Sequence, residues 1–279
     1  MRKLIIILIL LLIPRLALAG VISLTTTIST DIMTENVTKI HVKLLNSGDE
    51  PAHNVQLSLL AESFNANPIL VGELNPNEPF EGDFKVTLTE KILPGSYPIV
   101  ILTDYADANG YPFSSVSPSS IVYKTQTVSK VSGLIQEVSL AGKESKKLTL
   151  SIRNLDDVEH NVDVKLILPR EIKVVDDENK ISVGSKQEKS LDFEVSSLSA
   201  ISGSTYAVVA SIEYEDELHY SSFANGIIRI DGGAKQKTQE SEGTSTLAYI
   251  VLFILIIFVL IYAYPKYIKR GKTIEKKNR

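Results

Sequence analysis

The stretch TDYADANGYPFSS, residues 103–115, contains the residue types from which proteins build calcium sites. Its candidate calcium ligands are Asp104, Asp107 and Asn109. A calcium loop of the EF-hand type also needs an acid at its first position and a glutamate six residues after its glycine. The chain has Tyr105 and Val116 at those two positions. The Asn-Gly pair of the stretch, flanked by alternating apolar residues, favours a β-hairpin turn over a calcium loop.

Other residue types that perform chemistry are few and scattered. The chain has no cysteine, which excludes disulfides, thiol nucleophiles and cysteine-bound metals. No nucleotide-binding, dinucleotide-binding or serine-hydrolase motif occurs in the sequence. A hydrolase that uses two carboxylates stays open, because acids from different strands can meet in space. We therefore expect a protein that is not an enzyme, with no catalytic residue, no cofactor-binding residue and no resident metal.

The four histidines do not suggest a metal site either. They are His41, His53, His160 and His219. Metal ligation needs three or four ligands that converge on one ion. His53 and His160 lie at equivalent positions of an internal repeat, and equivalent positions in separate domains do not converge. We expect them to form structural hydrogen bonds where strands begin.

One modification site is present. Asn36 begins the sequence Asn-Val-Thr, which is an acceptor for N-linked glycans. In a host without that machinery, the same residues are only a turn into a strand.

An internal repeat organises the central part of the chain. Residues 40–60 read IHVKLLNSGDEPAHNVQLSLL, and residues 148–168 read LTLSIRNLDDVEHNVDVKLIL. Asn46 then corresponds to Asn154, and the apolar residues around both alternate in the same phase. Segments 108 residues apart that share this pattern indicate a tandem duplication.

Within each copy, apolar and polar residues alternate with period two, which is typical of antiparallel strands with one buried face. In the first copy, the pattern predicts strands at 22–29, 39–46, 54–61, 68–73, 82–89, 97–105 and 111–123. Seven short strands in about 100 residues suit an immunoglobulin-like sandwich. The expected fold class is all-β, with two tandem Ig-like seven-stranded antiparallel β-sandwiches, 20–125 and 126–231, and one C-terminal transmembrane helix.

The two ends of the chain differ from this central part. Residues 1–19 begin with basic residues, continue with an apolar run and end in Ala-Leu-Ala, which predicts a signal peptide cleaved after Ala19. Residues 246–264 are uncharged and largely apolar, which predicts one transmembrane helix. A flexible polar stalk, 232–245, precedes this helix, and a basic tail, 265–279, follows it.

Charge sets the predicted orientation. The basic tail places the C-terminus in the cytoplasm and the ectodomain outside the plasma membrane. Of the 29 basic and 33 acidic residues, three basic ones lie in the signal peptide and seven, with one acid, in the tail, so the exported part carries a net charge of −13. Such a surface repels nucleic acid, which we exclude as a partner. The tail itself is able to bind anionic lipid headgroups.

The motifs of the first copy are similar to those of a known group of surface domains. They are an Asn-Ser-Gly-Asp turn at 46–49, GELNPNEPFEGDFKVTL at 72–88 and PGSYPIVILTDYADANG at 94–110. This pattern resembles the Ig-like domains of S-layer-related archaeal surface proteins, bacterial cell-adhesion-related domains and the Ig-like domain of some alpha-galactosidases. The second copy has a weaker version, LPREIKVV and GSTYAVVASIEY, with Asp-Asp where a Ser-Gly turn is expected. The resemblance implies a non-catalytic module exposed on the envelope.

Three functions agree with these observations. The first is a membrane-anchored surface protein with a structural or adhesive role, whose partners are envelope or membrane proteins. The second is an accessory docking subunit of a membrane complex for export or transport. The third is a calcium- or carbohydrate-binding module, although sugar platforms are usually built from exposed aromatic residues and the chain has no tryptophan. We expect the first.

Overall fold

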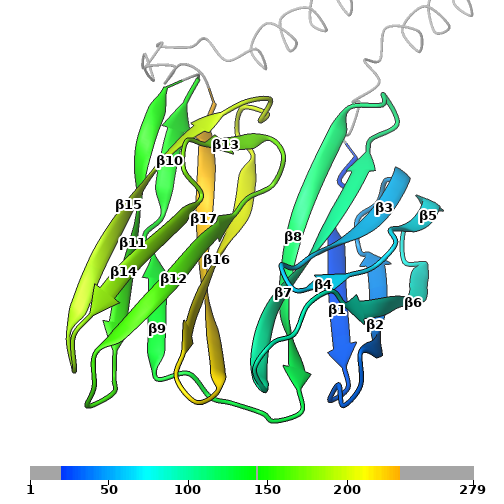
Figure 1. Cartoon of the computed structure of the whole chain (residues 1–279). Coiled ribbons are helices and arrows are strands. Elements are labelled where there is room, and N and C mark those ends of the chain that lie inside the picture. Colours follow the sequence, from blue (N-terminus) through cyan, green and yellow to red (C-terminus); the bar gives the residue numbers. More distant parts are fainter. Residues whose placement is uncertain (1–19, 143, 233–279) are drawn as a thin grey trace, which may run out of the picture. The chain divides into compact units, whose positions relative to one another are not determined.

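The computed structural model describes residues 20–142 and 144–232 (Figure 1). All regular elements of these residues are strands, which confirms the all-β class for this part of the chain. It contains no helix that is long and apolar enough to cross a membrane. The predicted signal peptide, the transmembrane helix, the basic tail and all but the first residue of the stalk lie outside the described residues.

The first sandwich packs two sheets around one apolar core. Its strands are β1 (Leu24–Thr30), β2 (Val37–Asn46), β3 (Ala52–Leu60), β4 (Phe64–Asn65), β5 (Ile69–Leu74), β6 (Pro79–Leu88), β7 (Gly95–Ala106) and β8 (Pro112–Tyr123). One sheet has the order β1-β2-β6-β4, and in the other β3 lies between β5 and β7, with β8 on β7. Ile40, Leu44 and Phe84 from the first sheet meet Ile99 and Ile101 from the second in this core.

The second sandwich repeats this arrangement around a core of its own. Its strands are β9 (Val131–Ile135), β10 (Val138–Ala141), β11 (Ser145–Asn154), β12 (His160–Ile167), β13 (Ile172–Val174), β14 (Glu178–Val183), β15 (Glu188–Ser197), β16 (Thr205–Glu215) and β17 (His219–Asp231). One sheet has the order β13-β15-β11-β9, and the other runs β14-β12-β16-β17 with β10 on β17. Phe193, Leu148 and Ile212 lie in this core.

The prediction of seven strands in each copy was too low, because alternation over long windows misses short pairings. β4 and β13 are pairs of two and three residues with β6 and β15, too short to alternate visibly. The first strand of the second copy is split, since β9 pairs with β11 while β10 crosses to the other sheet and pairs in parallel with β17. In the first copy, this crossing is reduced to one parallel bridge between Met33 and Tyr123.

Two equivalent asparagines are buried at the same position of each sandwich. Asn46 and Asn154 are fully buried at the ends of β2 and β11. Asn46 Nδ2 donates to the carbonyl oxygens of Glu50 and Leu74, at 2.8 and 3.2 Å. The Asn154 amide likewise donates to Val158 and to Val183, at 2.7 and 3.0 Å. Each asparagine therefore ties the turn after its own strand to the end of the edge strand opposite, since a buried amide needs such partners.

The two sandwiches share a sheet. β17 pairs with β7 in parallel at one position only, His219 opposite Gly95. His219 N–H donates to the carbonyl of Pro94 at 2.9 Å. A Cβ added to Gly95 would lie 2.1 Å from the His219 carbonyl oxygen, so only glycine allows this approach. The result is a nine-stranded sheet that spans both copies.

Candidate functional site

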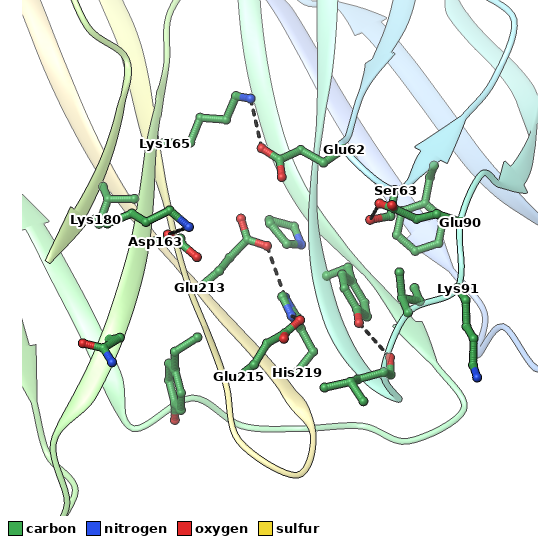
Figure 2. Close-up of a pocket in the computed structure, with 18 of the residues that line it drawn as sticks. Glu62, Ser63, Glu90, Lys91, Asp163, Lys165, Lys180, Glu213, Glu215 and His219 are labelled. Atoms are coloured by element: carbon green, nitrogen blue, oxygen red, sulfur yellow. Dashed lines mark hydrogen bonds and ion pairs between the residues drawn. The ribbon is translucent and has the colours of Figure 1, made fainter. Parts of the chain in front are cut away.

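A cleft of about 980 Å³ opens where the two copies meet, and both of them line it (Figure 2). The first copy contributes the loop after β3, with Glu62 and Ser63, the loop before β7, with Glu90 and Lys91, and Tyr97 of β7. The second copy contributes side chains of β12, β14, β16 and β17, namely Asn161, Asp163, Lys165, Asn179, Lys180, Glu213, Glu215 and His219. The cleft is therefore polar, and its charges come from both halves of the duplication.

His219 lines the cleft, where it contacts Tyr97 of the first copy and two glutamates of its own copy, Glu213 and Glu215. Its ring stacks on Tyr97 with the centroids 3.9 Å apart and the planes 8° from parallel. Its Nε2 lies 3.1 Å from Glu213 Oε2, and its Nδ1 lies 3.4 Å from Glu215 Oε1. Each ring nitrogen therefore has a carboxylate oxygen as its neighbour.

Tyr97 is held from both sides. Its hydroxyl donates to the Leu93 carbonyl oxygen at 2.7 Å. Burial raises the pKa of the Tyr97 hydroxyl, and the charges of Glu215 and Glu213 raise it further. The tyrosine is therefore neutral at any physiological pH, and it acts as a flat platform and a hydrogen-bond donor.

The polar groups around His219 have the wrong order for nucleophilic catalysis. Ser211 is buried, and its Oγ donates to Glu213 Oε1 at 3.2 Å. Glu213 therefore lies between the serine and the imidazole. In a catalytic triad the imidazole lies between, because it must take the proton from the serine hydroxyl. The imidazole is therefore not placed to take a proton from Ser211.

Ion pairs neutralise much of the charge in the cleft. Lys165 Nζ lies 3.0 Å from Glu62 Oε1, which joins the two copies across the cleft (Figure 2). Lys180 Nζ lies 2.8 Å from Asp163 Oδ1 on the neighbouring strand. At the Lys165–Glu62 pair the cleft continues into a more apolar groove of about 440 Å³, which shares Glu62, Pro98, Lys165 and Glu213 with it. The whole depression thus offers a charged part and an apolar part.

A second set of contacts joins the two sandwiches at the other end of β7. The region where the sandwiches contact each other is called the junction below. Arg170 donates from Nε and from an Nη to the two carboxylate oxygens of Asp104, at 2.6 and 2.9 Å. The next residue, Glu171, is buried, and its carboxylate accepts from Ser114 N at 2.6 Å and from Ser114 Oγ at 2.7 Å. Tyr111 donates to the Ser199 carbonyl oxygen at 2.7 Å. Charge-assisted bonds of this kind are among the strongest polar contacts in proteins.

Apolar side chains fill the space between these two ends. Val100, Leu102 and Val116 from β7 and β8 form a separate buried cluster with Val209 of β16. Ile167 and Phe223 pack against the cluster. These side chains point away from their own sandwich cores, because they alternate with core residues along their strands. The junction has an apolar centre with polar contacts on both sides.

The structure gives the calcium candidates different partners. Asp104 is bound by Arg170, as described above, whereas the Asp107 carboxylate accepts from the N–H groups of Asn109 and Tyr111, at 2.9 and 2.8 Å. The bond from Tyr111, with smaller contributions from Asn109 and Gly110, lowers the pKa of Asp107. Across residues 20–142 and 144–232, no three His, Cys, Asp or Glu side chains are grouped so that they could hold a metal ion.

The hairpin predicted at the same stretch is present. β7 and β8 pair in antiparallel register from Gly95 opposite Tyr123 to Ala106 opposite Pro112. The turn is longer than an Asn-Gly pair alone, since Gly110 N–H donates to the Asp107 carbonyl oxygen at 2.9 Å. Only Gly110 takes a positive φ there, at 78°, while Asn109 does not.

The remaining singled-out residues lie apart from the cleft. Asn36 is exposed in the turn directly before β2, where its side chain is accessible to a modifying enzyme. His160 begins β12, and its Nε2 lies 3.2 Å from Asp156 Oδ2, which is the structural role that we expected. His53 pairs more loosely with Glu73 at 3.6 Å. Of the four histidines, only His219 lines the cleft.

Sequence reasoning missed the junction, although two segments carry its signal. PIVIL, residues 98–102, and YAVVASI, residues 206–212, are continuous runs of apolar and small residues within otherwise alternating copies. Such runs are typical of strands that are buried on both faces. In the structure, Ile99 to Thr103 are all buried, as are Val208 to Ile212.

The strand order, the two separate cores and the turns define a pair of Ig-like β-sandwiches. No protein-family model matches the chain, and none of the curated proteins matches it. Among solved structures, Escherichia coli alpha-2-macroglobulin activated by porcine elastase is similar at 12% identity and a TM-score of 0.32, covering 77% of this chain and 22% of that one. This chain therefore spans less than a quarter of that protein's length.

Two further solved structures are similar at the same low level. A protein of unknown function from Porphyromonas gingivalis W83 has 12% identity and a TM-score of 0.30, and the match covers 73% of this chain and 98% of that one. A non-cellulosomal cohesin from Archaeoglobus fulgidus has 16% identity and a TM-score of 0.28, covering 37% of this chain and 91% of the cohesin.

Proposed function

We propose that this chain is a non-catalytic cell-surface protein, anchored in the plasma membrane by residues 246–264, whose two Ig-like sandwiches bind another protein of the cell envelope. The observation that carries the proposal is the cleft, whose walls belong to two sandwiches held together by buried bonds. A fixed surface loses little conformational freedom when a partner binds, so more of the contact energy remains as affinity. The resemblance to S-layer-related and adhesion-related domains supports the envelope as the location.

The chemistry of the cleft suits a polypeptide partner. Several of its charged side chains are paired with each other, as in Lys165–Glu62 and Lys180–Asp163, so a partner with mixed charges can exchange these pairs for its own. The neighbouring apolar groove, with Leu60, Leu168 and Val174, accepts apolar side chains of the same partner. Interfaces between proteins combine an apolar centre with such a polar rim.

Crosslinking of the full chain in its native membranes tests the proposal. A photoreactive residue at Asn161 lies in the cleft, and one at Lys85, exposed on β6 and outside the cleft lining, serves as the matched control. We expect a protein adduct from position 161 that position 85 does not give. The same adducts from both positions, or none from position 161, would show that the cleft is not the binding surface.

The identity of the adduct decides between two roles. An envelope or surface protein supports the structural and adhesive role. A protein with several membrane spans, recovered with the rest of an export or transport complex, assigns the chain the role of an accessory docking subunit instead.

A further inference from the structure

One edge of the first sandwich lacks the features by which sheet edges are normally kept from pairing. An edge strand presents unpaired N–H and C=O groups, and proteins protect such edges with charges, prolines, bulges or very short strands. β1 has the sequence LTTTIST, with no charge, no proline and no glycine. Its seven residues pair with β2 without a register shift, so its outer edge is regular as well.

Apart from β9 and β10 of the second sandwich, the other edges of the described sheets carry such protection. β4 and β13 have two and three residues. β5 pairs with β3 through two register shifts, and Gly72 within it has a φ of 87°. β14 carries Lys180, and β8 carries Pro118.

The second copy provides an internal comparison. Its strand equivalent to β1 is β9, which has five residues before the chain leaves that sheet and β10 continues on β17. The first copy keeps its chain at the sheet edge for seven residues. The duplicated fold can therefore close this edge, and the first sandwich leaves it open.

The direction of the free hydrogen-bonding groups follows from two bonds just before β1. Ser47 N–H donates to the Ser23 carbonyl oxygen at 2.8 Å, and Asp49 N–H donates to that of Val21 at 2.9 Å. Antiparallel pairing alternates bonded and unbonded residues, so the odd-numbered residues face β2. The residues whose N–H and C=O groups point to the open edge are Leu24, Thr26, Ile28 and Thr30.

The side chains of the same residues add an apolar reason for pairing. Leu24 and Ile28 face the core of the first sandwich but are only partly buried against it. Thr25, Thr27 and Ser29 face solvent and carry hydroxyl groups only. Any strand added at this edge would cover the two half-exposed apolar side chains, which is favourable by about 25 cal/mol for each Å² removed from water.

We propose that this edge pairs with the same edge of a second copy of the chain, with the β1 strands antiparallel about Thr27. In this register, Thr26 lies opposite Ile28 and Leu24 lies opposite Thr30. All four outward-facing residues of each molecule then form hydrogen bonds with the other molecule. No other register uses all four. The uncharged strand brings no like charges together, and a two-fold axis at Thr27 closes the assembly at two copies. This inference does not depend on the proposed function.

Cysteine crosslinking tests the register directly, because the natural chain has no cysteine. In the proposed pair, Thr27 of one molecule lies opposite Thr27 of the other molecule. This is a position without hydrogen bonds between the strands, where Cα atoms are about 4.5 Å apart. A Thr27→Cys variant can then form a disulfide, which requires Cα atoms roughly 4.4 to 6.8 Å apart. Thr25 is four residues away from Thr25 of the second copy, or about 14 Å.

The full chain is oxidised in its native membranes and again after purification in detergent. Thr27→Cys is expected to give covalent dimers, while Thr25→Cys and Ser29→Cys, each alone, give almost none. Co-expression of Thr25→Cys with Ser29→Cys is expected to restore the dimer, because these residues lie opposite each other. Crosslinking of Thr27→Cys that does not exceed that of Thr25→Cys overturns the proposal, as does an adduct with another protein in place of the dimer.

A proline at position 26 blocks the edge without touching the pairing with β2, since the Thr26 N–H points outward. Adding Thr26→Pro to Thr27→Cys is expected to abolish the covalent dimer and to leave the thermal midpoint within a few degrees. If that variant does not fold, Thr27→Lys places two like charges on the axis, and sedimentation should then show a monomer where the unaltered chain is a dimer. A dimer in either blocked variant contradicts the proposal.

Discussion

Replacing Glu171 by alanine should weaken the association of the two sandwiches more than any other single side-chain truncation at the junction. The carboxylate is buried and accepts two hydrogen bonds from Ser114, from N at 2.6 Å and from Oγ at 2.7 Å. Hydrogen bonds to a charged group contribute about 1.5 to 3 kcal/mol each, so the substitution should cost about 3 to 6 kcal/mol. For a cooperative unit of about 200 residues, this lowers the thermal midpoint by roughly 6 to 24 °C.

Calorimetry of the full chain measures this effect. The unaltered protein should unfold in one transition, because its two cores are coupled through the junction, whereas Glu171→Ala should unfold in two. Glu90→Ala is the matched control, since Glu90 accepts from Ser63 Oγ at 2.8 Å in the same kind of pair at an exposed position. It should change stability by less than about 0.5 kcal/mol. Equal effects of the two substitutions, or two transitions in the unaltered protein, would refute this reasoning.

Three further predictions concern other parts of the fold. Gly95→Ala should lower the urea midpoint by more than Gly110→Ala, since a Cβ at position 95 meets the His219 carbonyl oxygen at 2.1 Å while one at position 110 meets nothing and suffers only the strain of a positive φ, about 1 to 2 kcal/mol. Asn46→Ala and Asn154→Ala should each destabilise the protein by about 2 to 4 kcal/mol in chemical denaturation, because both leave buried carbonyls without donors; a loss at one site only would mean that their roles differ. A hydrogen bond from Lys130, helped by the Asp157 N–H, lowers the pKa of Asp156 to about 2, so its stabilising effect is complete above the unfolded value of about 3.9 and is lost as the pH falls through about 2. As the pH is lowered from about 3.9 to about 2, the thermal midpoint of the unaltered protein should therefore decrease, and that of Asp156→Asn should decrease less.

Alternation and repetition predicted most of the strands, because both are local properties of the chain. The seven strands expected in the first copy correspond to β1, β2, β3, β5, β6, β7 and β8, with ends shifted by a few residues. The short strands β4 and β13 were not predicted, because two or three residues are too few to show an alternating pattern. The hairpin at the Asn-Gly pair was found because turn chemistry is also local.

The cleft could not be derived in the same way, because its geometry depends on how the two copies pack. Glu171 and Ser114 are 57 residues apart, and nothing in either segment names the other as a partner. Nothing in the sequence distinguishes His219 from the other histidines, since its contacts with Tyr97 and Glu213 involve strands of different copies. The apolar run at 98–102 predicts a strand covered on both faces, but it does not tell what covers it.

The way in which β17 is held has a mechanical consequence. β17 pairs with β16 in antiparallel register from Thr205 opposite Arg229 to Glu215 opposite His219, and its last four residues pair in parallel with β10. Hydrogen bonds of a sheet lie across the strands, so a force along β17 loads many of them at once in shear instead of opening them one at a time. Asp231 ends this strand. A pull applied there is therefore resisted by the full length of the strand.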